Sequence, residues 1–180
     1  MAREWQVRQD EGLGFSIVLR PPLPSAREGW PYTAATCALA DVVGETARIH
    51  WPDEVHADGA RVAAVGVDVE PGPERIRWAV VTVLVEAATP PRAPLLADHV
   101  RAIEARLEDE PARVLEDHRS RCATLGRKLR ARLIPVGPAG PQVEGVAVDL
   151  LEDGALVLRT TAERRVAIPP QNLGIIEEAL

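Results

Sequence analysis

The sequence predicts an α+β protein in which a mixed or antiparallel sheet with helices precedes a small β-barrel. In residues 1–123, apolar runs of strand length alternate with segments of helical periodicity, whereas residues 124–180 hold short strands separated only by turns. Charge divides the chain at the same point. Residues 1–123 hold 14 arginines against 20 acidic residues, and residues 124–180 have no net charge. We therefore predict two domains, over 1–123 and 124–180.

The first predicted elements are a strand and a helix. Residues 15–19 form a short apolar run that is followed closely by three prolines, as in a buried strand that ends in a stiff turn. Pro31 suits the first turn of a helix, where its missing N–H is not needed. Ala35 and Leu39 then begin an apolar helical face that ends near Gly44, so we expect this helix to cover one side of the sheet.

Four strands follow in the predicted sheet. Residues 48–51 and 55–57 are short strands, and Asp58-Gly59 is a strong hairpin signal that leads into a longer strand over 62–69. The most apolar strand spans 76–85 and carries apolar residues on both faces. That pattern is typical of a central strand that is covered on both sides.

Two helices and the barrel complete the prediction. Leu96, Val100, Ile103 and Leu107 have the spacing of an amphipathic helix, and a second short helix begins near Pro111. The barrel strands are short and closely spaced, and they are predicted over 129–136, 143–150, 155–159 and 166–168.

Composition excludes several classes of function. The chain has 180 residues, a net charge of −6 and no apolar run of membrane-spanning length, so neither a nucleic-acid interface nor a membrane segment is expected. The N-terminus lacks the apolar core of a signal peptide. Two cysteines and four histidines form no disulfide framework and no metal motif. We expect a cytoplasmic protein with reduced thiols and no metal.

Five stretches, in this order, resemble the biotin protein ligase family. The first, 14–21, is similar to the strand after that family's ligand loop. The second, His50-Trp51-Pro52-Asp53-Glu54, resembles its Lys-Trp-Pro-Asn-Asp motif. The remaining three are 58–64, which resembles the next hairpin, 121–127, which resembles the junction into the family's SH3-like C-terminal barrel, and 152–156, which resembles that barrel's central turn. The resemblance covers nearly the whole chain and implies that the predicted barrel is SH3-like.

The resemblance implies a chemistry with defined requirements. Members of the family join biotin to ATP as biotinyl-5′-AMP and transfer the acyl group to a lysine of a carboxylase carrier domain. Because phosphates and a carboxylate must meet, such a site needs fixed positive charge and close backbone approach. The family supplies these with a Gly-Arg-rich loop, the lysine of Lys-Trp-Pro-Asn-Asp and a lysine in the next hairpin.

This sequence departs from the family at each of those points. Arg3 and Trp5 resemble the last residues of the Gly-Arg-rich loop, so the chain is expected to be truncated at its N-terminus. His50 replaces the first lysine, and a histidine of ordinary pKa is mostly neutral at pH 7. Arg61 replaces the second lysine, and Asp53 adds a negative charge where the family has a neutral Asn.

The later glycine-rich strand of the family also differs here. It corresponds to residues 82–87, where Thr82 and Leu84 stand in place of glycines and Glu86 stands near the family's Asn. Lys128, the only lysine in the chain, lies in the predicted barrel and not at a site position. Together the changes remove cations, add anions and fill space where a phosphate would bind.

The individual candidates allow two interpretations each. His50 and Trp51 either line a remodelled ligand pocket or are a strand-end histidine and a core tryptophan. Arg61 either binds an anion or is a solvated hairpin arginine. Glu86 is either catalytic through a raised pKa or a strand-end carboxylate that meets solvent or an arginine.

The favoured function is a degenerate ligase-like protein that no longer makes biotinyl-AMP and acts through protein–protein interaction. Its partner would be a second copy, a true ligase, a carrier domain or a chain that supplies the missing strands, because missing strands leave a sheet edge uncovered. No cofactor is expected in this case. The alternative is an active or repurposed biotin- or lipoate-type ligase or acyltransferase, which would use biotin and ATP. A third possibility is that the reading frame begins upstream and that 1–180 is a fragment.

Overall fold

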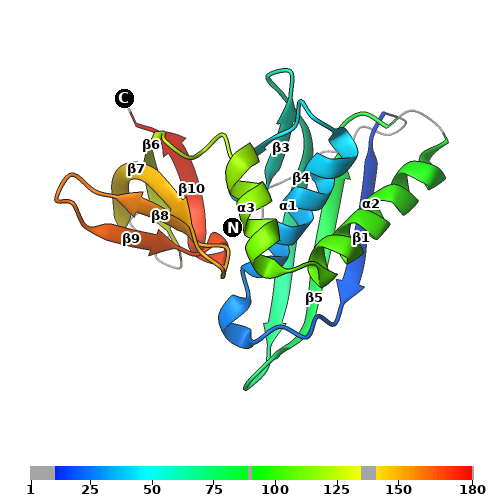
Figure 1. Ribbon diagram of the computed structural model, residues 1–180, viewed down its shortest axis with the longest axis horizontal. Coiled ribbons are helices and arrows are strands. Elements are labelled where there is room, and N and C mark those ends of the chain that lie inside the picture. The colour runs from blue at the N-terminus through cyan, green and yellow to red at the C-terminus, as the bar shows by residue number, and fades with distance from the viewer. Residues whose placement is uncertain (1–10, 89–90, 135–140, 180) are drawn as a thin grey trace.

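The fold consists of two antiparallel sheets and three α-helices. The computed structural model describes residues 11–88, 91–134 and 141–179. Within them, one five-stranded sheet with its helices lies beside a second five-stranded sheet that is built from the C-terminal part of the chain (Figure 1). The predicted α+β class is confirmed, with both sheets antiparallel.

The first sheet has the strand order β1-β5-β4-β3-β2. Its strands are β1 Leu13–Leu19, β2 Arg48–His50, β3 Glu54–Ala57, β4 Ala60–Pro71 and β5 Ile76–Val85. The order follows from short connections, since β2, β3, β4 and β5 are consecutive antiparallel neighbours and β1 pairs with the outer side of β5.

Helices cover one face of this sheet. Residues aligned across the strands, such as Phe15 on β1, Val65 on β4 and Val83 on β5, point to the same face. That face packs against α1 Trp30–Val43 and α2 Arg92–Glu108, which lie across the sheet in Figure 1. Apolar alternation along the strands produces this core, because a period of two places every second residue on the covered face.

The prediction that β5 is a central strand covered on both sides holds only in part, because β5 lies between β1 and β4 but its second face is only partly covered. The strand lies one position from the sheet edge. On the face away from the helices, Trp78 is 38% exposed and the neighbouring Val18 of β1 is 69% exposed. Alternation in the sequence indicates that apolar residues occupy the second face of the strand. It does not indicate whether another element covers that face.

The hairpin between β3 and β4 sets the register around the predicted site. Asp58 and Gly59 have φ values of 51° and 79°, the left-handed conformation that a two-residue hairpin turn requires. The turn places Arg61 opposite His56, and β2 pairs so that His50 lies opposite Glu54. The predicted turn is confirmed.

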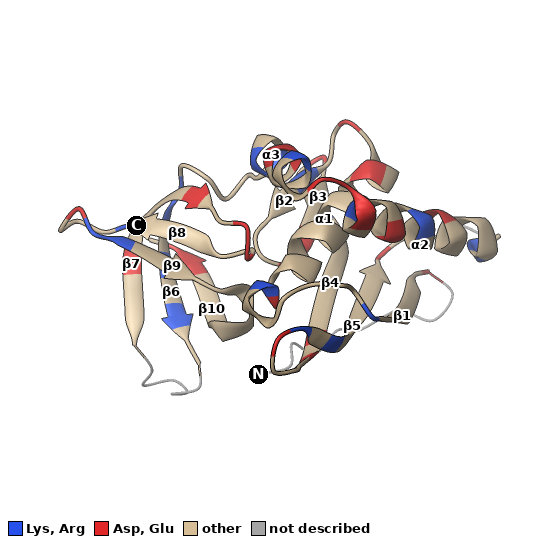
Figure 2. Ribbon diagram, turned by 60° about the horizontal axis from the view of Figure 1, so that its bottom comes forward, with Lys and Arg blue, Asp and Glu red and all other residues tan. Residues whose placement is uncertain are grey.

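A third helix and an ion-pair network stabilise the packing of the helices on one another. The helix α3 spans Pro111–Arg121 and packs on α1. Arg106 of α2 binds Asp41 of α1 at 2.7 Å and Asp117 of α3 at 2.6 Å, and Arg121 of α3 also binds Asp41 at 2.8 Å. Figure 2 shows charged residues along α2 and α3, where these pairs form.

The second sheet has the strand order β10-β6-β7-β8-β9. Its strands are β6 Lys128–Leu133, β7 Gln142–Leu150, β8 Leu156–Arg159, β9 Arg165–Ile168 and β10 Leu173–Glu178. The predicted closed barrel is not confirmed, because β10 and β9 lie at opposite ends of this order and do not pair within the described residues. The sequence analysis missed β10, and residues 135–136 of the first predicted barrel strand lie outside the described residues.

The two sheets meet at the turn after β2. The indole Nε1 of Trp51 donates to the carbonyl oxygen of Gly154 at 3.0 Å, and the Trp51 N–H donates to Oγ1 of Thr124 at 2.9 Å. Gly29 and Gly154 approach so closely that a Cβ on Gly154 would lie 2.6 Å from the Gly29 carbonyl oxygen.

The predicted boundary between 1–123 and 124–180 stays a prediction, and the second sheet begins at Lys128. In the described part of the chain, no helix is long and apolar enough to cross a membrane.

Candidate functional site

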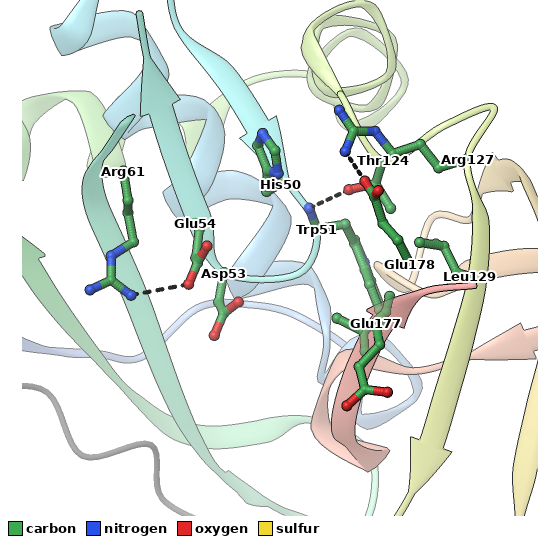
Figure 3. A pocket seen from close by; sticks show the side chains of 11 residues that line it. His50, Trp51, Asp53, Glu54, Arg61, Thr124, Arg127, Leu129, Glu177 and Glu178 are labelled. Carbon is green, nitrogen blue, oxygen red and sulfur yellow. Dashed lines mark hydrogen bonds and ion pairs between the residues drawn. The ribbon is translucent and has the colours of Figure 1, made fainter. Parts of the chain in front are cut away.

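A cavity of about 550 Å³ opens where the two sheets meet. Four of the predicted ligand-binding residues line it, namely His50, Trp51, Asp53 and Arg61 (Figure 3). The other described lining residues are Glu54, Thr124, Arg127, Leu129, Ile176, Glu177 and Glu178. The structure therefore brings most of the predicted site residues together, and the second sheet contributes a wall that the sequence analysis did not anticipate.

Strand alternation places the polar residues on one face. Ile49 and Val55 are fully buried, so their neighbours His50, Glu54 and His56 point to the opposite face of the sheet. Arg61 joins them from β4, beside His56. Short strands with an apolar residue at every second position thus produce a row of ionisable groups along one side.

Arg61 is held between two carboxylates. Its Nε donates to Oε1 of Glu86 at 2.5 Å, and its Nη1 donates to Oε1 of Glu54 at 3.1 Å. The hydrogen bond from Arg61 to Glu86 is the main reason that the pKa of the guanidinium is raised. Glu86 does not line the cavity, but it reaches the site through this contact. The positive charge that the sequence retains at this position is already offset by protein groups.

His50 is stacked on a second histidine. The ring centroids of His50 and His56 lie 3.9 Å apart, with an angle of 18° between the ring planes. Nε2 of His56 lies 3.0 Å from Oε2 of Glu54. Burial lowers the pKa of His50, and the electrostatic influence of His56 and Arg127 lowers it further. His50 is therefore neutral at pH 7 and supplies no fixed positive charge.

Trp51 and Asp53 are buried at the turn between β2 and β3. Trp51 is 4% exposed and bonds to the second sheet, so it joins the two sheets in addition to lining the cavity. Asp53 is 8% exposed, and its backbone carbonyl accepts a hydrogen bond from the Val65 N–H at 2.7 Å. Its side chain borders this cavity and a second one beside it.

The second cavity, of about 650 Å³, lies between β4 and the C-terminal sheet. Its lining includes Thr82, which the sequence resemblance places at a glycine position of the family. The other described residues that line it are Glu28, Tyr32, Pro52, Asp53, Val65, Gly66, Val67, Asp68, Val69, Ile134, Pro170, Gln171, Leu173 and Gly174. Those described lining residues include three carboxylates and neither lysine nor arginine.

Several contributors to the site were not predicted. Arg127 forms an ion pair with Glu178 of β10 at the rim of the first cavity (Figure 3). Thr124 anchors Trp51 from 73 residues away in the sequence. The sequence did contain a signal that His56 lies beside His50. The two residues are on facing strands of a tight hairpin, where such positions become diagonal neighbours. The predicted loop remnant, Arg3 and Trp5, lies outside the described residues.

The lone lysine and the potential metal ligands bear on which cofactors the protein could bind. Lys128 is placed on β6, where its Nζ lies 3.2 Å from Oε1 of Glu144, and it does not line either cavity. Among the described residues, no cluster of three or more His, Cys, Asp or Glu side chains could hold a metal ion.

Comparisons with known proteins identify the fold. No protein-family model matches the chain, and no curated protein sequence is significantly similar to it. Solved structures do match. A biotin protein ligase-like protein of unknown function from Silicibacter sp. is 18% identical, with a TM-score of 0.69, and the alignment covers 90% of this chain and 80% of that one.

Biotin protein ligase from Aquifex aeolicus matches over a similar length. Its apo structure is 18% identical with a TM-score of 0.68, and the alignment covers 95% of this chain and 84% of the ligase. The structure in complex with biotin and ATP is also 18% identical, with a TM-score of 0.69 and coverage of 98% and 82%. The chain therefore has a biotin protein ligase-like fold, as the sequence resemblance predicted.

Proposed function

We propose that this protein is a ligase-like protein that has lost biotinyl-AMP synthesis and acts through protein–protein interaction. The observation that carries the proposal is the environment of Arg61, which replaces a ligase lysine. Both Glu86 and Glu54 already bind its guanidinium. To bind a phosphate, Arg61 would have to share its single positive charge with these two carboxylates, which offset that charge and repel the anion.

The charge around the first cavity supports the same proposal. Its described lining residues contain two arginines, Arg61 and Arg127, and both are paired with carboxylates. Four carboxylates line the same cavity, those of Asp53, Glu54, Glu177 and Glu178. Because like charges repel in a partly enclosed site, this arrangement opposes the approach of ATP and of pyrophosphate.

The second candidate function is an active or repurposed biotin- or lipoate-type ligase or acyltransferase. The observation that favours it is the first cavity, whose volume of about 550 Å³ lies in the ordinary range for small-molecule sites. Trp51 of the ligase-like motif lines that cavity, and the adjacent Pro52 lines the second one. Under this candidate the ligands would be biotin and ATP, and an acceptor lysine would come from a carrier domain.

Biotin-dependent exchange of label between ATP and pyrophosphate separates the two candidates. The purified chain is assayed beside the Aquifex aeolicus ligase as a positive control, and beside the Arg61→Ala variant of this chain. We expect no exchange above the biotin-free background for either form of this chain. Exchange that requires biotin and that falls in Arg61→Ala would overturn the proposal and establish the ligase alternative.

The proposal also specifies the setting in which the protein acts. We place it in the cytoplasm, which is supported by two unpaired and buried thiols, Cys37 and Cys122. It has no cofactor, and its partner is a protein: a second copy, a true ligase, a carrier domain or a complementing chain. Nucleic acid and membrane are not among its partners.

A further inference from the structure

One face of the first sheet has no helical layer in the described part of the chain. The helices α1 and α2 pack on the face that carries Val65 and Val83, so the alternate residues of each strand point to the opposite side, the outer face (Figure 1). Oγ of Ser16 and Oγ1 of Thr82 lie 2.9 Å apart, which shows that even-numbered residues of β1 and β5 share this outer face. Exposed side chains on the outer face are therefore available to another protein.

Apolar side chains on the outer face form one patch. The register places Val18 of β1 directly beside Val80 of β5, and Trp78 lies two residues along β5, diagonal to Val18. We call Val18, Trp78 and Val80 the Trp78 patch. Of the four large apolar side chains that are exposed in the described chain, Val18 and Trp78 are two, and they are neighbours. An exposed tryptophan beside other apolar side chains is typical of a protein–protein contact surface.

Charges of opposite sign flank the Trp78 patch on its two sides. On the β4 side are Asp68 and Glu70, and the register places Glu70 directly beside Trp78. On the β1 side is Arg20, which follows the last residue of that strand. Because Arg20 precedes Pro21, its backbone is restricted to extended conformations, so it continues the alternation onto the outer face, level with Trp78. Within the described residues, none of these three charged side chains forms an ion pair.

This arrangement of charges is complementary to itself. A two-fold axis that runs along β5, parallel to the sheet, places β1 of one copy over β4 of the other and keeps each row of residues at the same level. Arg20 of each copy then faces Glu70 of the other, which gives two equivalent ion pairs, and the two Trp78 side chains meet beside the axis. Sheets that stack face to face at about 10 Å, with their strands aligned, provide the packing geometry.

We propose that the Trp78 patch is the contact between two copies of this chain, which form a symmetric dimer by stacking the outer faces of their first sheets. The partner is a second copy because a patch with a cation on one side and carboxylates on the other fits its own surface, and fits neither a uniformly acidic nor a uniformly basic one. The patch is small, so the dimer is weak, with a Kd on the order of 100 µM. This inference rests on the proposed function as an interaction protein and names its partner and its contact surface.

Sedimentation equilibrium of the full chain measures the association. Between about 10 and 500 µM, we expect the average mass to rise from that of a 19.5 kDa monomer toward twice that value. Raising the salt concentration from about 0.05 to 0.5 M is expected to raise Kd about threefold, because ion pairs at the rim of the contact are screened. A monomer mass at about 500 µM would mean that the patch is bare or meets a different protein, and either result overturns the proposal.

Two charge reversals test the symmetry of the contact. In its own dimer, Arg20→Glu places like charges opposite each other, and so does Glu70→Arg, so each variant alone is expected to dimerise at least about fivefold more weakly. In an equimolar mixture, the mixed dimer has one ion pair of the original sense and one of reversed sense. We expect it to form with a Kd within about twofold of the wild type, measured by sedimentation with one variant fluorescently labelled. No recovery in the mixture would contradict the two-fold arrangement.

Val18→Asp tests the apolar part of the contact. The substitution places a charge on the Trp78 patch and close to Asp68 of the other copy, so we expect Kd to rise at least about tenfold. The matched control is Val148→Asp, at an exposed valine of β7 outside the patch, which should change Kd less than about twofold. The urea unfolding midpoint of both variants checks that the fold persists. Equal effects of the two substitutions would show that the patch is not the contact.

Failure of this inference is distinguishable from failure of the proposed function. The ATP–pyrophosphate exchange assay reports on biotinyl-AMP synthesis, whereas sedimentation reports on association. A chain that stays monomeric and shows no exchange overturns the dimer alone. A chain that dimerises through the Trp78 patch and shows biotin-dependent exchange overturns the proposed loss of activity and leaves the contact surface established.

Discussion

His118 makes the stability of the fold dependent on pH. This side chain of α3 is 1% exposed, and neither ring nitrogen has a hydrogen-bond partner among the described residues. Burial, with a smaller contribution from Arg119, lowers the pKa of His118 to about 4. Replacing it by leucine, which is apolar and similar in size, removes both the titration and two buried polar atoms without opening a large cavity.

The size of the effect follows from the two pKa values. The folded pKa of about 4 lies below the ordinary 6.5, so the unfolded chain binds the proton more tightly. The stability contribution is fully present above pH 6.5 and is lost as the pH falls toward 4. At 1.36 kcal/mol for each pKa unit, the loss reaches about 2 kcal/mol at pH 5 and about 3 kcal/mol below pH 4.

Urea unfolding of the wild type and of His118→Leu between pH 7.5 and 4 measures this contribution. Acidic residues destabilise both proteins at low pH, and the difference between the two isolates His118. We expect the variant to be more stable by about 1 kcal/mol at pH 7, because it buries no unsatisfied nitrogen, and the advantage to grow by about 2 kcal/mol at pH 5. Parallel pH profiles would refute the reasoning.

Two further predictions concern ion pairs. Arg106→Ala leaves carboxylates of the helical layer without their shared, largely buried partner and should lower the free energy of unfolding by about 3 kcal/mol, whereas Arg101→Ala, at an exposed pair, should lower it by less than about 0.5 kcal/mol in the same urea titration. Replacing both Glu54 and Glu86 by glutamine releases Arg61 and should tighten pyrophosphate binding about tenfold by calorimetry. Unchanged affinity would show that the two carboxylates do not suppress anion binding.

Much of the fold could be predicted because local chemistry marks it. The Asp58-Gly59 turn set the β3–β4 hairpin, and Pro31 marked the start of α1. The closed barrel was not confirmed and β10 was missed, since pairing between strands distant in sequence depends on tertiary packing that alternation does not encode. The same limit explains β5, whose second face is only partly covered.

The candidate site was predictable in its members and not in its contacts. The resemblance led to His50, Trp51, Asp53 and Arg61, and the structure gathers these around one cavity. That a strand-end carboxylate, Glu86, would meet an arginine was one of the two interpretations. Which arginine it meets depends on the register of β4 against β5, and that register emerges only from the folded sheet.

The burial of Trp51 illustrates a double role. The sequence offered a core tryptophan or a pocket residue as alternatives, and the structure shows both, since the indole is buried, lines the cavity and bonds to the Gly154 carbonyl. Gly154 lies in a turn more than one hundred residues later in the chain, so no local pattern could pair the two residues.

Calorimetric titration of biotin into the full chain, with and without ATP, tests the central claim most directly. The Aquifex aeolicus ligase, whose structure with biotin and ATP has the same fold, serves as the positive control. The account predicts no saturable heat for this chain at concentrations that saturate the ligase, because its site offers paired arginines and neutral His50 in place of free cations. Saturable biotin binding that ATP strengthens would contradict it.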